Sequence, residues 1–192
     1  MSLTPVSPQR YGTVAMSLHW LIALAIIANL AIVFLIEDMP RPDRMFWMGW
    51  HKSIGLTVLI LSLARVAWRL THPAPAHPVG ISPAQRIAGA ALHHLFYLMI
   101  IVVPLAGWLM VSTNPRPIPF FGLFDFPAFP GLSGMTREEA HPYHELFENI
   151  HVLVGWAFVF LVPVHIAAAL YHHHFLKNNV LLRMIPGSKL RP

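Results

Sequence analysis

The sequence predicts an all-α membrane protein, a bundle of four transmembrane helices. Of its 192 residues, 56% are hydrophobic and only 11% are charged, whereas soluble domains carry roughly 25% charged residues. So few charges cannot cover a water-facing surface, and the chain contains four apolar stretches, each long enough for the roughly 20 residues that a membrane-spanning helix needs. We therefore expect one domain, residues 1–192, with membrane lipid as its solvent.

The first predicted span is residues 17–36, which contain no Lys, Arg, Asp or Glu. It is longer than the apolar region of a signal peptide and no clear cleavage site follows it, so we expect it to be retained. The other three spans are expected at about 47–69, 88–112 and 147–175. The last two contain Pro104 and Pro163, which membrane helices tolerate because neighbouring groups satisfy the freed carbonyls.

The loop charges predict the orientation of the bundle. Most basic residues flank the spans on the side of the N-terminus, and all eight acidic residues lie on the opposite side. The positive-inside rule therefore predicts that both termini are cytoplasmic. Because the basic residues flank spans, the net charge of +5 does not indicate nucleic-acid binding. The external loop, residues 113–146, is rich in Pro, Gly and Phe and is expected to form an ordered cap.

The chain contains no cysteine but thirteen histidines. Disulfides, thiolate metal sites and covalently attached c-type haem are therefore excluded. A bound metal must be held by histidine or oxygen ligands. Histidines within the spans are the first candidates, because metal-binding residues in membrane helices are usually functional.

Four histidines match two binding sites stacked across the membrane. His151 and His165 are fourteen residues apart, nearly four helical turns, so they share one face of the fourth span at an axial distance of about 21 Å. His51 enters the second span from outside and His19 enters the first from inside. Depth therefore pairs His51 with His151 and His19 with His165. Two imidazoles from different helices are the axial ligands of a six-coordinate haem iron, so the set predicts two haems.

Other residues remain alternatives for these roles, since a single histidine near a helix end is more often an interfacial residue. His93 lies at the depth of His19 and is a rival ligand or a hydrogen-bond partner for a haem propionate or a quinone, as is His94. Arg65 and Arg69 suit propionates of the inner haem or ordinary positive-inside anchoring, and Lys52 suits an outer propionate or an anionic donor. His172–His174 are expected to form an interfacial belt. His141 and His144 are expected to be solvated residues of the external loop, with a surface metal site as the alternative. Gly107 is one of several small residues that allow close approach of helices or haem.

Nearly the whole chain resembles the bacterial cytochrome b561 family. The matching segments are RYGTVAMSLHW, WHKSIGLTVLILSLARVAWR, STNPRPIPFFGLFDFPAF and NIHVLVGWAFVFLVPVHIAAALYHHHF. The resemblance implies a four-helix bundle in the bacterial inner membrane with two haem b groups, bound by His19, His51, His151 and His165. It implies electron transfer with a quinone as one partner. One branch of the family oxidises superoxide at the external face and reduces ubiquinone, and related cytochromes are membrane subunits of hydrogenases and formate dehydrogenases.

The leading hypothesis is therefore an oxidoreductase that passes electrons from an external donor, with superoxide as a candidate, to ubiquinone or another quinone. A positive patch should steer an anionic donor, and Lys52, Arg116 and Arg137 are candidates for it. The alternative is an anchor subunit that relays electrons for a partner dehydrogenase or hydrogenase through the external loop. A redox partner protein and a homodimer both remain open. A histidine-bound metal transporter or di-iron enzyme is disfavoured because the span cores contain no carboxylates.

Overall fold

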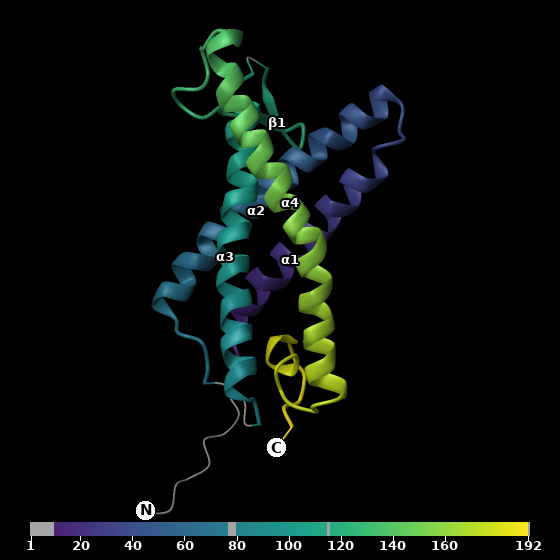
Figure 1. Ribbon diagram of the computed structural model, residues 1–192, viewed down its shortest axis with the longest axis vertical. Coiled ribbons are helices and arrows are strands. Elements are labelled where there is room, and N and C mark those ends of the chain that lie inside the picture. The colour runs from purple at the N-terminus through teal and green to yellow at the C-terminus, as the bar shows by residue number, and fades with distance from the viewer. Residues whose placement is uncertain (1–9, 77–79, 115, 192) are drawn as a thin grey trace, which may run out of the picture.

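A computed structural model describes residues 10–76, 80–114 and 116–191, and four long helices dominate this part of the chain (Figure 1). They are α1 (Thr13–Leu35), α2 (Arg41–Thr71), α3 (Pro83–Ser112) and α4 (Arg137–His174). All four are long and apolar enough to cross a membrane. The predicted all-α, four-helix membrane fold is thus confirmed.

The helices pack in chain order, α1 on α2, α2 on α3 and α3 on α4. In Figure 1, α1 and α2 run obliquely across the steeper α3 and α4. Among the described residues, the backbone of α4 makes few close contacts with α1 or α2. Side chains, rather than closely packed backbones, therefore occupy the interface between α4 and the first two helices.

At the N-termini of α3 and α4, polar residues cap the helix and carry it beyond the apolar stretch. Thr136 accepts a hydrogen bond from the backbone of Glu139, whose side chain bonds back to the Thr136 backbone, and Ser82 and Gln85 do the same at the start of α3. Such capping boxes satisfy the free N–H groups of a helix N-terminus. As a result α4 begins at Arg137, so residues 137–146, expected to be loop, are helical.

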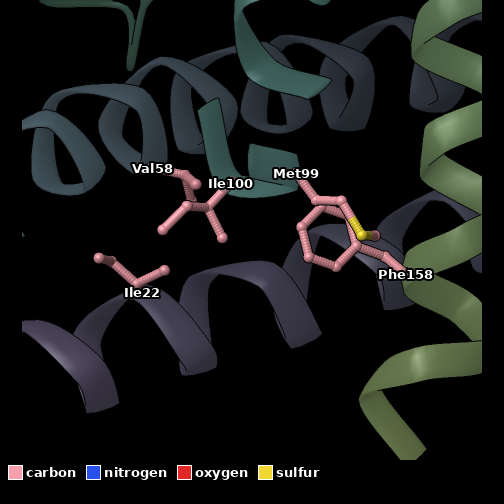
Figure 2. Close-up of a cluster of buried hydrophobic side chains, with 5 residues drawn as sticks. All are labelled: Ile22, Val58, Met99, Ile100 and Phe158. Atoms are coloured by element: carbon pink, nitrogen blue, oxygen red, sulfur yellow. The ribbon is translucent and has the colours of Figure 1, made fainter. Parts of the chain in front are cut away.

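One buried cluster joins all four helices (Figure 2). It consists of Ile22 from α1, Val58 from α2, Met99 and Ile100 from α3, and Phe158 from α4. Outside this cluster many large apolar side chains remain exposed on the helices, among them Leu24, Leu63, Leu98 and Phe160. An apolar exterior of this extent is what a lipid environment requires.

A small hairpin covers one end of the bundle. Its strands, β1 (Ile118–Phe120) and β2 (Phe124–Phe126), pair antiparallel. Two fully buried serines fasten the surrounding loop to the helices. The Ser53 hydroxyl on α2 accepts a hydrogen bond from the Phe121 amide at 2.9 Å, and that of Ser112 on α3 accepts one from the Phe129 amide at 2.9 Å.

The opposite end of the bundle holds both ends of the described chain. The C-terminal segment folds back through a short 3-10 helix, η1 (Leu182–Met184). Its Arg183 carbonyl accepts a hydrogen bond from the Tyr11 amide, and the Met184 carbonyl accepts one from Nε1 of Trp20 at 2.6 Å. Residues 10 and 191, the ends of the described chain, therefore lie on the same side of the bundle (Figure 1).

Candidate functional site

His51 and His151 lie side by side near the hairpin end of the bundle. His51 comes from α2 and His151 from α4, and their ring centres are 6.0 Å apart with an angle of 79° between the ring planes. The backbones of α2 and α4 make few close contacts with each other. The two imidazoles therefore lie in an interface that backbone packing does not fill.

His19 and His165 form a second pair toward the end that holds the termini. His19 comes from α1 and His165 from α4, with ring centres 6.3 Å apart and an interplanar angle of 74°. The buried Phe158 is seven residues from both His151 and His165, an axial distance of about 10.5 Å in each direction. The apolar cluster therefore separates the two pairs.

The spacing within each pair fits one metal ion held between two imidazoles. Two ligand nitrogens on opposite sides of an ion, each about 2.0–2.1 Å from it, put the ring centres about 6.4 Å apart, because each centre lies about 1.2 Å behind its nitrogen. The observed 6.0 and 6.3 Å agree with this separation. Among the described residues no three metal-ligating side chains are placed so that they could hold one metal ion together. Two protein ligands suffice for a haem, whose porphyrin provides the other four.

The His151 ring is oriented by α3. Its Nδ1 lies 2.9 Å from the Val103 carbonyl, and because a carbonyl only accepts, Nδ1 carries the proton. A proton on Nδ1 leaves Nε2 as the nitrogen that can bind a metal, as is usual for ligand histidines. A Cβ on Gly107 would lie 2.9 Å from this Nδ1, so the ring fits only because residue 107 has no side chain. The sequence marked Gly107 merely as one of several small residues and gave no signal for Val103.

His93 lies beside the inner pair. Its ring centre is 5.8 Å from that of His165, about as close as His19, so the geometry allows either residue to face His165. His94 points elsewhere and bonds the Ala90 carbonyl at 2.7 Å. The structure thus keeps His93, and not His94, near the inner site.

Arg65 brings a positive charge to the inner site. Its guanidinium lies over the Tyr97 ring, 5.5 Å from the ring centre, and its buried Nη1 has no hydrogen-bond partner among the described residues. A buried donor without an acceptor is costly, so this group fits an anionic ligand such as a haem propionate. Arg69 instead donates to the His72 carbonyl at 3.4 Å and is less suited to that role.

A basic pocket of about 470 Å³ lies at the hairpin end, against the first turns of α2. Its lining residues are Arg41, Arg44, Met45, Met48, Lys52 and Arg116, none of them acidic. Two of the three cations expected to steer an anion, Lys52 and Arg116, therefore come together. Arg137 does not join them and lines a different hollow with Glu138 and His141.

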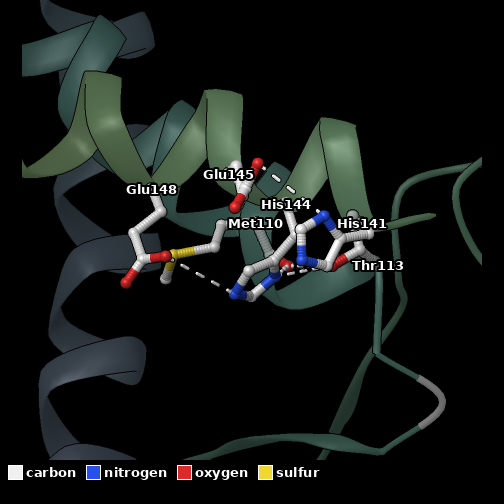
Figure 3. A network of polar contacts seen from close by, with 6 residues as sticks. All are labelled: Met110, Thr113, His141, His144, Glu145 and Glu148. Atoms are coloured by element: carbon white, nitrogen blue, oxygen red, sulfur yellow. Dashed lines mark hydrogen bonds and ion pairs between the residues drawn. The ribbon is translucent and has the colours of Figure 1, made fainter. Parts of the chain in front are cut away.

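The histidines at the start of α4 make structural contacts (Figure 3). Nδ1 of His144 lies 2.9 Å from the Thr113 hydroxyl and 3.2 Å from the Met110 carbonyl, which links α4 to the end of α3. His141 lies 3.7 Å from a Glu145 carboxylate oxygen on the exposed surface. These contacts account for both residues without a metal ion.

Comparison with known proteins agrees with the geometry. Residues 10–187 match the family model described as prokaryotic cytochrome b561. The chain is 30% identical to cytochrome b561 homolog 2 of Escherichia coli (strain K12), an alignment that covers 95% of this chain and 94% of the relative. It is 29% identical to the probable superoxide oxidase CybB of Yersinia pestis, covering 94% and 98%, and 28% identical to cytochrome b562 of Cereibacter sphaeroides, covering 91% and 94%. The chain therefore belongs to the prokaryotic cytochrome b561 family and is a multi-pass membrane electron carrier of the haem b type.

Proposed function

We propose that this cytochrome holds two haem b groups, one between His51 and His151 and one between His19 and His165, and passes electrons from an external donor to a membrane quinone, ubiquinone being one candidate. The observation that carries the proposal is the pair of imidazole sites. Each has the ring-centre separation that one iron ion requires, and α4 contributes one histidine to each. The predicted placement of both termini in the cytoplasm makes the His51 site the external one.

A bound haem supplies a one-electron carrier, and the protein sets its surroundings. The paired imidazoles would hold the iron, and the Val103 carbonyl keeps the His151 proton on Nδ1. The cluster around Phe158 and Met99 excludes water between the two sites. The Arg65 guanidinium provides a buried positive charge for an inner propionate, for which His93 is a further hydrogen-bond donor.

The basic pocket at the hairpin end supports an anionic donor at the external face. Its cations include Lys52 and Arg116, and no carboxylate lines it, so its potential should attract small anions and raise their rate of encounter. Superoxide is the donor we propose, since one relative carries the name probable superoxide oxidase. Lys52, which lines the pocket, follows His51 directly in α2, so the pocket lies at the end of the bundle that holds the outer site.

A haem count on the purified protein tests the proposal. A pyridine haemochrome assay with a reduced-minus-oxidised spectrum should give two b haems per chain. His51→Ala and His151→Ala should lose the same haem, and His19→Ala and His165→Ala the other. His93→Ala should keep both. Loss of the inner haem in His93→Ala with retention in His19→Ala would reassign that ligand, and a haem-free protein would refute the proposal.

The donor is tested separately by mixing the oxidised protein with superoxide and following haem reduction. Lys52→Gln and Arg116→Gln should slow the reaction and weaken its dependence on ionic strength, whereas Arg137→Gln, in a different hollow, is the matched control. If small donors fail to reduce the protein and a dehydrogenase co-purifies with it, the role of an anchor subunit is favoured instead.

A further inference from the structure

Residues 177–191, here called the strap, follow α4 and turn back toward the bundle. The last residue of α4 lies nine residues, and therefore about 13.5 Å, beyond His165. The strap returns from that end, and its Met184 carbonyl accepts a hydrogen bond from Nε1 of Trp20 at 2.6 Å. Trp20 follows the inner histidine His19 directly in α1. The strap therefore reaches the turn of α1 that carries an inner histidine.

The strap is also bonded to the end of α4. Nδ2 of Asn178 donates to Nδ1 of His172 at 2.8 Å, and Nη1 of Arg191 donates to the His173 carbonyl at 3.0 Å. The helices α1 and α4 carry the two histidines of the inner pair, yet their backbones make few close contacts with each other. At this end of the bundle the strap therefore bridges the two helices that form the inner site (Figure 1).

Hydrogen bonds fix the strap as a closed loop. The Asn179 side-chain amide accepts a hydrogen bond from the Arg191 main-chain N–H and donates one to the Arg191 carbonyl, both at 2.8 Å. Arg183 is buried, and its Nη1 donates to the Ala76 carbonyl, which lies in the connection between α2 and α3, at 2.7 Å. Local opening of such a segment has to break several of these bonds together, so the open form is rare.

The position of the strap bears on which electron acceptors reach the inner site. An acceptor dissolved in water approaches from this end of the bundle, whereas one dissolved in lipid approaches from the side. Electron transfer slows steeply with distance, so a segment that keeps a soluble acceptor away selects against it. The strap carries four cations (Lys177, Arg183, Lys189 and Arg191) and no acidic residue. Charge would therefore attract an anionic acceptor to this end, and only steric closure can exclude it.

We propose that the strap closes the inner site against water-soluble electron acceptors and that Trp20 is the positioning residue that holds it there. The inference rests on the proposed two-haem function and adds to it a selection of the acceptor. Electrons leave the inner haem for an acceptor dissolved in lipid, such as a quinone. A soluble acceptor receives them only when the strap opens.

Ferricyanide, an anion that does not cross membranes, tests the closure, because it takes one electron from a ferrous haem and becomes ferrocyanide. The full-length protein is reduced with a lipid-soluble quinol in right-side-out and in inverted membrane vesicles, which expose opposite faces, and haem oxidation is followed after mixing. Trp20→Phe keeps an aromatic ring and removes the N–H donor. In one vesicle type only, it should speed oxidation about 2- to 12-fold, the effect of one lost hydrogen bond on the open fraction.

Two further variants separate opening of the strap from general damage. Asn179→Ala removes the two bonds that close the strap and should speed oxidation from the same face at least as much. Trp108→Phe is the matched control, because its Nε1 makes a similar bond to the Pro127 carbonyl, at 3.0 Å, at the hairpin end. It should leave the rate from the strap face unchanged. Both strap variants should keep the wild-type haem spectra and potentials, which a loosened bundle would alter.

Haem content separates this proposal from the proposed function. A wild-type protein without two haems refutes both together. If the wild type holds two haems, an unchanged oxidation rate in Trp20→Phe and Asn179→Ala refutes the closure alone, as does an equal increase from both faces. Should Trp20→Phe fail to fold, Asn179→Ala decides by the same measurement.

Discussion

Gly107 of α3 leaves no room for a side chain beside the His151 ring, which makes it an informative position to change. A Cβ there would lie 2.9 Å from Nδ1 of His151 and 3.0 Å from its Cε1. Ordinary van der Waals contact begins at 3.4 Å, so Gly107→Ala has to move the ring by about 0.5 Å, the difference between 3.4 and 2.9 Å. The ring cannot move away from residue 107 and keep its 2.9 Å bond to the Val103 carbonyl.

The cost follows from weakening that hydrogen bond, and its upper limit is the complete loss of the acceptor. A buried donor left without an acceptor costs about 1–3 kcal/mol, which corresponds to about 5- to 150-fold in an equilibrium constant. Changes behind a metal-ligating histidine typically weaken binding by about 10- to 100-fold, which falls within this range. Gly107→Ala should therefore weaken binding of the outer haem by about this factor and leave the inner haem in place.

Haem transfer to apomyoglobin measures the effect, with the remaining haem identified by its reduced-minus-oxidised spectrum. Gly155→Ala is the matched control, because it lies on α4 one turn from His151 and a Cβ there would meet nothing within 4 Å. The control should retain both haems. If Gly107→Ala binds the outer haem as tightly as the wild type, with an unchanged potential, the His151 imidazole does not ligate haem in the orientation that the structure shows.

Three further results are expected. Arg65→Gln should make the inner haem harder to reduce, because a buried positive charge is lost, whereas Arg69→Gln should not; equal effects in a redox titration would contradict a specific role. Both haems should give highly anisotropic low-spin resonance signals, since the paired imidazole planes stand at 79° and 74°; signals typical of parallel planes would disagree. Ser53→Ala should leave the Phe121 amide without its acceptor at a cost of about 1–3 kcal/mol, so limited proteolysis should cut the hairpin loop faster, and an unchanged rate would show that the serine does not fasten it.

The sequence predicted the number of helices because a helix that spans lipid must be a long apolar stretch, and such stretches are found directly from hydropathy. It was less accurate at the helix ends. Residues 137–146 were expected to be loop, yet α4 begins at Arg137. The reason is that a capping box and backbone hydrogen bonds continue a helix into water, where apolar length no longer applies.

The pairing of histidines by depth was within reach of the sequence, since antiparallel spans and a rise of about 1.5 Å per residue fix how far each residue lies from the membrane surface. The structure brings His51 to His151 and His19 to His165. Their role as ligands stays a prediction until haem is counted in the variants.

By itself, then, the sequence determined an apolar four-helix membrane protein with histidines at two depths, because composition and helical rise are properties of single segments. Only the tertiary structure decided that Gly107 makes room for His151, that Asn29 of α1 bonds the main-chain carbonyl of His51, and that His93 stays beside His165. These contacts depend on how far each helix is rotated and how steeply it crosses its neighbour, which interdigitating side chains set between helices and the hydropathy of one span does not encode.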